Sequence, residues 1–509
     1  MADNKSQIKS GVLLSYLNMA LGMLIPFFYT PVMLRMLGQE EYGLFSLSTS
    51  VVAYLSLLSF GFGTTIIRYI AKYRAEEDMD SLRRLYGFFI MLYCGMAVLV
   101  IVCGVVLANN VEPIFHKGLT SDEQIKMRSL ILIMTVSSAL SFPLSVFTSM
   151  VIAYERFIFR NLLNILSTII GPAANLIALF LGYKSIGMAF AGVAVQLLFL
   201  PWNIWYCRSK LQLRPIFCRL PKGFIFEIIN VSFFHFLSSI VEMLFWATDK
   251  VILGMLASSV AVAIYNIGAT FHNMVVNLSS AIASVLMPKI TKMVYTKATN
   301  KELTDLFIKV GRIEFIIVTL FITGYTVFGR QFISLWVGDS YSEAYAVALI
   351  TMYPICIPLI QNVGLNIVIA RNKHRFRSVL YLIIAIVNVV TTYLTVPIWG
   401  IIAAALCSGV SYFIGHGIIM NIYYWKVTGI DIPKFWKTIL RMSIVPILMV
   451  TGGLIILNYV TINSWLTFLL GVIAYLIVYI ILMWFFVMNS YEKSFLQNAL
   501  SRVKGRFSK

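Results

Sequence analysis

The sequence predicts an all-α integral membrane protein with about 14 transmembrane helices, arranged as two six-helix lobes in a parallel repeat plus two C-terminal helices. Three observations predict this fold. Hydrophobic residues make up 60% of the 509 residues and charged residues only 12%, about half the charged share of a typical soluble domain. Apolar runs of membrane-spanning length recur along the whole chain. Stretches of the first half also recur in the second half.

The apolar runs give the expected helices in order. A helix needs about 20 mainly apolar residues to cross a membrane, and fourteen runs meet this requirement. Their approximate ranges are 11–37, 42–67, 86–107, 129–153, 159–182, 186–206, 230–256, 259–287, 313–335, 344–370, 378–396, 399–425, 438–460 and 464–488. Several runs contain proline, which membrane helices tolerate because neighbouring helices bond the freed carbonyls. The first run lacks a cleavage pattern and is predicted to be a retained span.

The distribution of lysine and arginine predicts the orientation. With the N-terminus inside, 33 of the 40 basic residues fall in inner segments or at inner helix ends. The seven outer ones are Arg35, Lys117, Lys126, Arg128, Lys184, Lys250 and Arg330. Since basic residues concentrate on the cytoplasmic side, both termini are predicted to be cytoplasmic. The same distribution accounts for the net charge of +19 without a nucleic-acid partner, because the basic bursts lack aromatic platforms.

The two halves of the chain share short stretches at nearly constant spacing. "VIAYERFIFRN" from Val151 recurs as "VIARNKHRFRS" 217 residues later, and "VMLRML" from Val32 recurs as "VILGML" 219 residues later. Asn175 and Asn388 match at an offset of 213. Six spans, an even number, separate the copies, so the halves insert in the same orientation. Such parallel repeats commonly keep a substrate site between their lobes.

This repeat predicts the domain organisation. The N-terminal lobe, spans 1–6, is expected over residues 1–222, and the C-terminal lobe, spans 7–12, over 223–428. Residues 429–509 are expected to form two additional spans and a cytoplasmic tail.

Several kinds of chemistry are not indicated. The chain has no G-x-x-x-x-G-K-[ST] phosphate loop, so energy is expected from an ion gradient, the membrane potential or the substrate gradient itself. The six cysteines are scattered without CxxC spacing, which indicates neither a disulfide framework nor a zinc site. We therefore expect no cofactor, no metal and no enzymatic activity.

Charged residues inside the seventh run are candidates for function. His235, Glu242 and Asp249 are seven residues apart, so each returns to nearly the same helix face. A charge at the middle of a span costs about 2.5–3.5 kcal/mol on insertion scales and needs a partner or water. Glu242 or Asp249 would bind a proton or a sodium ion, and Lys250 would contact phosphate. Alternatively, these residues form an internal ion pair that only fixes helix packing.

Other polar residues are weaker candidates. Arg35, near the outer end of the first run, could contact substrate or reach the headgroups. Asn175 and Asn388 recur in both halves and could bind substrate or join helices. His272, in the middle of the eighth run, could couple an ion, although a lone histidine in an apolar helix more often serves packing.

Arginines also mark the inner helix ends. Arg160 and Arg377 end the repeated stretches and are interpreted as positive-inside anchors, although a ring of such arginines could recruit an anionic headgroup. Glu314 follows Arg312 at another inner end and is interpreted as interfacial.

Three motifs give the chain a family resemblance. "RMLGQEEYGLFSL" (Arg35–Leu47), "GFGTTIIRYIAKY" (Gly61–Tyr73) and "TDKVILGML" (Thr248–Leu256) resemble segments of the polysaccharide branch of the multidrug/oligosaccharidyl-lipid/polysaccharide exporter superfamily. The resemblance implies a flippase that moves a polyprenyl-diphosphate-linked oligosaccharide from the inner to the outer leaflet of a bacterial cytoplasmic membrane by alternating access. Membrane lipids and a polysaccharide polymerase are the further partners that it suggests. The glycan class stays open.

Two alternatives remain open. A cation-coupled multidrug exporter of the sister branch would suit Glu242, although such exporters usually have twelve spans. A membrane-embedded glycan polymerase or ligase would need a larger outer loop than the segment Asn109–Arg128. Few basic residues are expected deep in the membrane: chiefly Lys250, with Arg35 near the rim. This scarcity argues against a cavity lined strongly by arginine.

Overall fold

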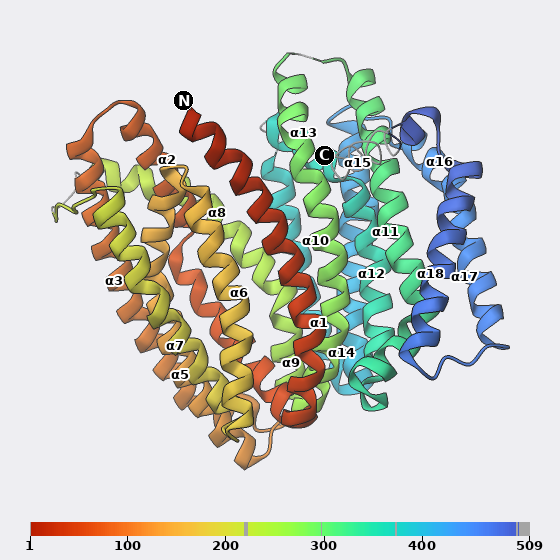
Figure 1. Ribbon diagram of the computed structural model, residues 1–509, viewed down its shortest axis with the longest axis horizontal. Coiled ribbons are helices and arrows are strands. Elements are labelled where there is room, and N and C mark those ends of the chain that lie inside the picture. The colour runs from red at the N-terminus through yellow and green to blue at the C-terminus, as the bar shows by residue number, and fades with distance from the viewer. Residues whose placement is uncertain (1, 218–221, 297, 372–373, 495–496, 498–509) are drawn as a thin grey trace. The chain divides into compact units, whose positions relative to one another are not determined.

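The computed structural model describes residues 2–217, 222–296, 298–371, 374–494 and 497, and in these residues every regular element is helical (Figure 1). The chain forms two compact units. Unit 1 comprises Met1–Asn266 with Ala385–Ile401, and unit 2 comprises Ile267–Ile384 with Ile402–Lys509. The lobe boundaries expected from the sequence repeat stay a prediction, since they rest on sequence repetition and not on packing.

Unit 1 is built mainly from the first nine α-helices. They are α1 (Ala2–Ala53), α2 (Phe62–Ala75), α3 (Met79–Asn109), α4 (Val111–Phe115), α5 (Ser121–Ala153), α6 (Phe157–Phe180), α7 (Lys184–Trp205), α8 (Lys222–Trp246) and α9 (Thr248–Leu256). A 3-10 turn, Tyr54–Ser59, follows α1, and a π-helical turn, Tyr206–Lys210, follows α7. Helix α5 begins with a capping box, in which Thr120 and Glu123 satisfy each other's backbone N–H groups.

Unit 2 contains most of the remaining helices. They are α10 (Ser259–Tyr295), α11 (Asn300–Val337), α12 (Ala344–Ile360), α13 (Asn362–Ala370), α14 (His374–Tyr412), α15 (Met420–Lys426), α16 (Ile432–Met442), α17 (Ile444–Leu457) and α18 (Trp465–Leu482). Three short turns accompany them: η3 (Asp339–Tyr341) between α11 and α12, η4 (Phe413–Ile419) between α14 and α15, and η5 (Met483–Val487) after α18. Helix α10 starts in unit 1, and the middle of α14 also belongs to unit 1.

The helices confirm the predicted all-α, multi-pass fold. Among the described residues, ten helical segments are long and apolar enough to cross a membrane, or eleven if the bent pair α12–α13 forms one span. Two segments, of 63 and 52 residues, are far longer than one crossing of about 30 Å requires at 1.5 Å per residue. Gly38 in α1 and Gly400 in α14 break them with φ of 80° and 58°. Each break lies where two predicted runs meet, and the count of fourteen stays a prediction.

Each unit has its own packing centre. In unit 1, α5 packs against α3 and α7, and α6 packs against α1 and α7. In unit 2, α11 contacts α12, α13, α16, α17 and α18. The fully buried rings of Phe307 and Phe435 lie at the core of this second group, with ring centroids 4.8 Å apart. Helix α11 is therefore the central element of unit 2.

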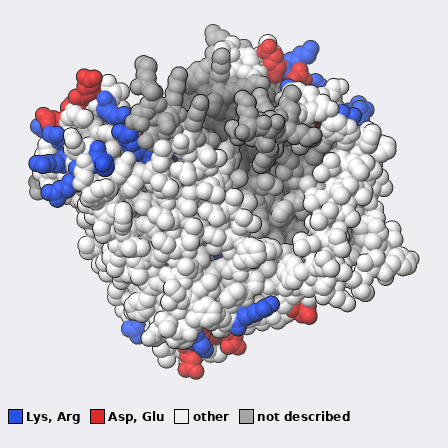
Figure 2. Space-filling view, viewed as in Figure 1, with Lys and Arg blue, Asp and Glu red and all other residues white. Residues whose placement is uncertain are grey.

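Charged side chains lie mainly near the helix ends. Figure 2 shows lysine and arginine gathered over the end of unit 1 where α2 is followed by α3, and an uncharged surface along the helices below it. The sequence there contains Arg68, Lys72, Arg74, Arg83 and Arg84. This pattern is typical of a multi-pass membrane protein. The sidedness of the chain in the membrane stays a prediction.

Candidate functional site

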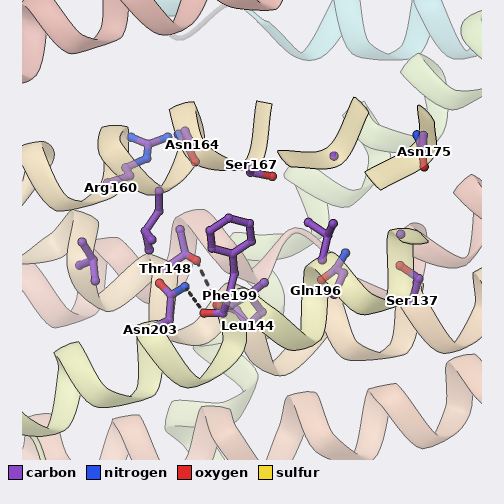
Figure 3. A pocket seen from close by; sticks show the side chains of 15 residues that line it. Ser137, Leu144, Thr148, Arg160, Asn164, Ser167, Asn175, Gln196, Phe199 and Asn203 are labelled. Carbon is purple, nitrogen blue, oxygen red and sulfur yellow. Dashed lines mark hydrogen bonds between the residues drawn. The ribbon is translucent and has the colours of Figure 1, made fainter. Parts of the chain in front are cut away.

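A polar cavity of about 310 Å³ lies inside unit 1 between α5, α6 and α7 (Figure 3). The polar side chains that line it are Ser137, Thr148, Arg160, Asn164, Ser167, Asn175, Gln196 and Asn203. All three helices belong to segments apolar and long enough to span a membrane. Polar groups at such positions are costly and commonly mark a substrate or ion pathway.

Helix α6 supplies a stripe of polar and small residues along the cavity. Arg160, Asn164, Ser167, Gly171 and Asn175 are spaced by three or four positions, which places them on one helix face. Figure 3 shows the side chains of Arg160, Asn164, Ser167 and Asn175 following one another along this helix. With a rise of 1.5 Å per residue, the stripe is about 22 Å long. It therefore extends over much of the roughly 30 Å thickness of a bilayer core.

Neighbouring residues on α6 fix the direction of this stripe. The Nδ2 atom of Asn161 donates to the carbonyl oxygen of Gly11 at 2.7 Å and to Oγ of Ser15 at 2.8 Å. The hydroxyl of Thr168 lies 3.2 Å from Oδ1 of Asn18, and its one hydrogen also has the Asn164 carbonyl as an acceptor at 2.8 Å. Because these bonds hold an adjacent face of α6 against α1, the helix cannot rotate freely, and its polar stripe stays directed into the cavity.

The other two helices offer hydrogen-bonding groups of different availability. Thr148 donates to the Leu144 carbonyl at 3.1 Å, and Asn203 donates to the Phe199 carbonyl at 3.0 Å, so both are engaged by their own helices (Figure 3). The Oε1 atom of Gln196 is buried, and no described residue donates a hydrogen bond to it. A buried polar atom of this kind is stabilised by any ligand that donates to it.

The charge in the cavity lies at one end. Arg160 is in the first turn of α6, which begins at Phe157. The N-terminus of a helix carries a partial positive charge, and its N–H groups lack intrahelical partners. The guanidinium group and the helix end together favour an anion with several oxygens, such as a phosphate group. The cavity thus combines an anion-binding end with a long neutral face of amides and hydroxyls.

Of the predicted site residues, Asn175 lines this cavity. Asn388, its predicted counterpart, is fully buried on the part of α14 that belongs to unit 1. Arg35 on α1 and Glu242 on α8 have exposed side chains. His272, on α10, is buried in unit 2, where its ring centroid lies 5.8 Å from that of Tyr412. The roles expected for these residues stay predictions.

Asp249 and Lys250 lie at the start of α9. Asp249 is 1% exposed, and its Oδ2 atom accepts a hydrogen bond from the Tyr265 hydroxyl at 2.5 Å. The preceding Thr248 is joined to the Tyr54 hydroxyl at 2.5 Å. Lys250 is partly buried. The contact with Tyr265 shows how the fold accommodates the Asp249 carboxyl group, whereas ion coupling by Asp249 stays a prediction.

The sequence interpretation missed several residues of the cavity. Arg160 is interpreted from the sequence as an anchor or as part of a ring that recruits an anionic headgroup, and the sequence pattern assigns no role to Asn164, Ser167, Gln196 and Asn203. A signal for three of them is present in the sequence, because Arg160, Asn164 and Ser167 recur at helical spacing inside an otherwise apolar run. Gln196 and Asn203 likewise lie seven residues apart on α7.

Comparisons with known proteins agree with this architecture. A family described as "Polysaccharide biosynthesis protein" matches residues 8–294. The "Putative O-antigen transporter" of Salmonella typhimurium is 23% identical over 301 residues, which cover 58% of this chain and 67% of that protein. These findings confirm the resemblance to the polysaccharide branch of the superfamily.

Solved structures of the superfamily share the fold. The lipid II flippase MurJ, in an inward closed conformation, has a TM-score of 0.73 at 16% identity, covering 92% of this chain and 97% of that one. An inward-facing multidrug resistance transporter of the MATE family has a TM-score of 0.60 at 13% identity, covering 83% and 98%. The fold is therefore that of the multidrug/oligosaccharidyl-lipid/polysaccharide (MOP) exporter superfamily.

Proposed function

Because this chain belongs to the family of polysaccharide biosynthesis proteins, we propose that it is a flippase for polyprenyl-diphosphate-linked oligosaccharides. It moves its substrate from the inner to the outer leaflet by alternating access, driven by an ion gradient. The proposed activity is transport, and the proposal includes no catalytic step. Support comes from the similarity to a protein named as an O-antigen transporter and from the polar cavity in unit 1.

The observation that carries the proposal is the polar stripe on α6. An oligosaccharide presents many hydroxyl groups, each of which can donate and accept hydrogen bonds. Asn164, Ser167 and Asn175 offer amide and hydroxyl groups at successive heights along about 17 Å of helix. Gln196 adds a buried acceptor from α7. As a sugar chain moves along such a surface, its hydroxyl groups leave one set of amides and hydroxyls and form hydrogen bonds with the next set.

The diphosphate fits the other end of the cavity. Arg160 at the N-terminal turn of α6 would hold the diphosphate, while the polyprenyl tail stays in the lipid. With the predicted orientation, this end faces the cytoplasm, where the substrate is loaded. Arg35 and Lys250, in the predicted outer half, would contact the phosphates later in the cycle. Asn388 is proposed as a further substrate ligand, and Glu242, Asp249 and His272 as ion-coupling groups.

Deleting the gene in its host and measuring lipid-linked oligosaccharides by mass spectrometry, together with the surface glycan, tests the proposal. One complete lipid-linked repeat unit should accumulate while its surface polymer disappears. If both pools are unchanged, the proposal is wrong. A fall in cationic dye efflux in that case would favour a multidrug exporter.

Two arginine variants test the site within the same strain. Arg160→Gln removes a charged hydrogen-bond donor worth about 1.5–3 kcal/mol, so export should slow by about tenfold or more. Arg208→Gln is the matched control, because Arg208 is exposed, follows α7 and does not line the cavity. Equal export by the two variants would contradict the role of Arg160 without contradicting transport itself.

A further inference from the structure

Unit 2 contains a carboxyl group whose side chain is fully buried in the protein. Glu314 on α11 has 0% exposure, and neither of its carboxyl oxygens has a hydrogen-bond partner among the described residues. Arg312 does not pair with it, because two positions on a helix are about 200° apart. Arg312 instead donates to the carboxylate of Glu492 at 2.5 and 2.9 Å and to the Val487 carbonyl at 2.9 Å. Glu314 is therefore enclosed by the protein itself, whereas its depth in the membrane stays a prediction.

Glu314 lies beside a broken span. Helices α12 and α13 meet at a bend of 48° between Ile360 and Asn362. On α11, one turn before Glu314, a Cβ atom at Gly311 would lie 2.7 Å from the carbonyl oxygen of Ile360, so only glycine allows this close approach. The amide of Asn362 is close enough to act on the Glu314 carboxyl, and it donates to Oγ of Ser279 at 3.0 Å.

The other groups packed against this part of α11 do not supply a balancing cation in the described residues. Cys356 on α12, near Glu314, is a thiol and carries no positive charge. The Tyr479 hydroxyl on α18 donates to the Ile316 carbonyl at 2.9 Å. Arg312 is held by Glu492. The residues that α16 and α17 bury are apolar: Ile432, Phe435, Ile439, Met442, Val445, Pro446 and Met449.

We propose that Glu314, in addition to the ion-coupling groups proposed above, takes up and releases a proton in the transport cycle, with the break between α12 and α13 as the element that moves with it. This inference rests on the proposed function. In the step itself, a proton adds to a carboxylate oxygen and forms an O–H bond, and the reverse step releases it. A sodium ion would need several oxygen ligands at once. In the described residues Glu314 has the Asn362 amide and the Cys356 thiol nearby but no cation, and such surroundings suit a neutral acid instead.

The geometry links protonation to conformation. The observed arrangement encloses Glu314 and is compatible with its neutral form, because an unpaired carboxylate is strongly disfavoured in an apolar interior. Loss of the proton therefore favours a state in which the contact between α11 and α13 opens and water reaches the carboxylate. A bent span can change its angle without losing its flanking helices, so the break is a suitable moving part.

Export in cells provides the first test. The full chain and three variants, Glu314→Gln, Glu314→Asp and Glu343→Gln, are expressed in the deletion strain, and immunoblots measure their amounts in the membrane. Glu343 is an exposed carboxyl group of the same unit and serves as the control. Export of the lipid-linked oligosaccharide, measured by mass spectrometry, should rise as the external pH falls, by up to about tenfold per pH unit. Glu314→Gln should be slow and insensitive to pH, whereas Glu314→Asp and Glu343→Gln should keep the pH response.

Infrared spectroscopy of the purified full chain in lipid provides the second test. The difference spectrum between acidic and alkaline pH should contain a protonated-carboxyl band that shifts in Glu314→Asp and stays in Glu343→Gln. An unchanged band in Glu314→Asp, an unchanged pH response in Glu314→Gln, or a sodium dependence that Glu314→Gln removes would each overturn the inference. If deletion causes no accumulation of lipid-linked oligosaccharide, the proposed function fails, while the infrared band still reports whether Glu314 holds a proton.

Discussion

The ion pair between Arg312 and Glu492 predicts a large and measurable loss of stability on substitution. Arg312 donates through two nitrogens to the two oxygens of Glu492, and the side chains are only 13% and 3% exposed. Removing one partner of a buried pair costs about 3–5 kcal/mol, because the other charge stays buried. Glu492→Gln keeps an amide oxygen as an acceptor, and Arg312 keeps its bond to Val487, so we expect a loss near 3 kcal/mol.

An exposed ion pair of the same unit provides the control. Lys434 and Asp305 are 2.9 Å apart, as close as many buried pairs, but their side chains are 51% and 55% exposed. Asp305→Asn should cost less than about 1 kcal/mol, because water screens the pair and solvates each charge. The assay is reversible unfolding of the purified full chain in detergent, with the free energy of unfolding compared among variants.

The double variant completes the test. Arg312→Met with Glu492→Leu removes both charges, so most of the loss caused by Glu492→Gln should be recovered. The reasoning is refuted if Glu492→Gln lowers the free energy of unfolding no more than Asp305→Asn does. It is also refuted if the double variant loses as much free energy as Arg312→Met and Glu492→Leu lose separately, added together.

Three further predictions concern local packing. Gly311→Ala should lower the free energy of unfolding by about 1–3 kcal/mol, because the new Cβ atom would lie 2.7 Å from the carbonyl oxygen of Ile360, the last residue of α12. Gly324→Ala is the control: its Cβ atom would have its nearest neighbour at 3.8 Å, so the melting temperature should stay unchanged or rise. Asn161→Leu should destabilise unit 1 by about 1–2 kcal/mol, measured by unfolding in detergent, since it loses two bonds to α1. Hydrogen bonds from Ser81 hold the pKa of Asp78 below its ordinary value, so Asp78 stabilises the start of α3 above the unfolded pKa of about 3.9. The protection of the Ser81 amide from hydrogen exchange, corrected for the pH dependence of the intrinsic rate, should therefore fall as the pH falls through the lower, folded pKa, and Asp78→Ala should remove this dependence. A protection factor independent of pH in the unmodified chain would contradict the last prediction.

The sequence predicted the membrane fold well because the bilayer restricts the possible structures so strongly. A spanning segment must satisfy its own backbone and must be mainly apolar, so hydropathy alone locates the helices. Even the breaks at Gly38 and Gly400 fall where two apolar runs meet. The repeat also led to Asn175, which lines the polar cavity. Each of these inferences depends on length, composition or spacing along one helix.

The contacts of the candidate site could not be predicted in the same way, because hydropathy does not fix the rotation of a helix. In the sequence pattern Arg160 lies at an inner helix end, where a role as a positive-inside anchor already accounts for an arginine. Its place in the cavity depends on the bonds of Asn161 and Thr168 to α1, and their partners lie about 150 residues earlier in the chain. Spacing could reveal the stripe on α6, but not which neighbouring helices it faces.

Charged residues in membrane spans show this limit most clearly. Each buried charge must be compensated by an ion pair, a hydrogen bond or a change of protonation, and the sequence does not say which of these occurs. Arg312 and Glu314 are two positions apart, yet Arg312 pairs with a residue 180 positions later. Asp249 receives a hydroxyl hydrogen bond from Tyr265 on the following helix. Glu314 lies in an apolar enclosure, where protonation itself removes the charge under our proposal. An ion pair and a hydroxyl bond each give a carboxylate a fixed place in the fold. Compensation by a proton is different, since it can be reversed in every cycle. A carboxyl group compensated in that way is therefore suited to couple proton movement to transport.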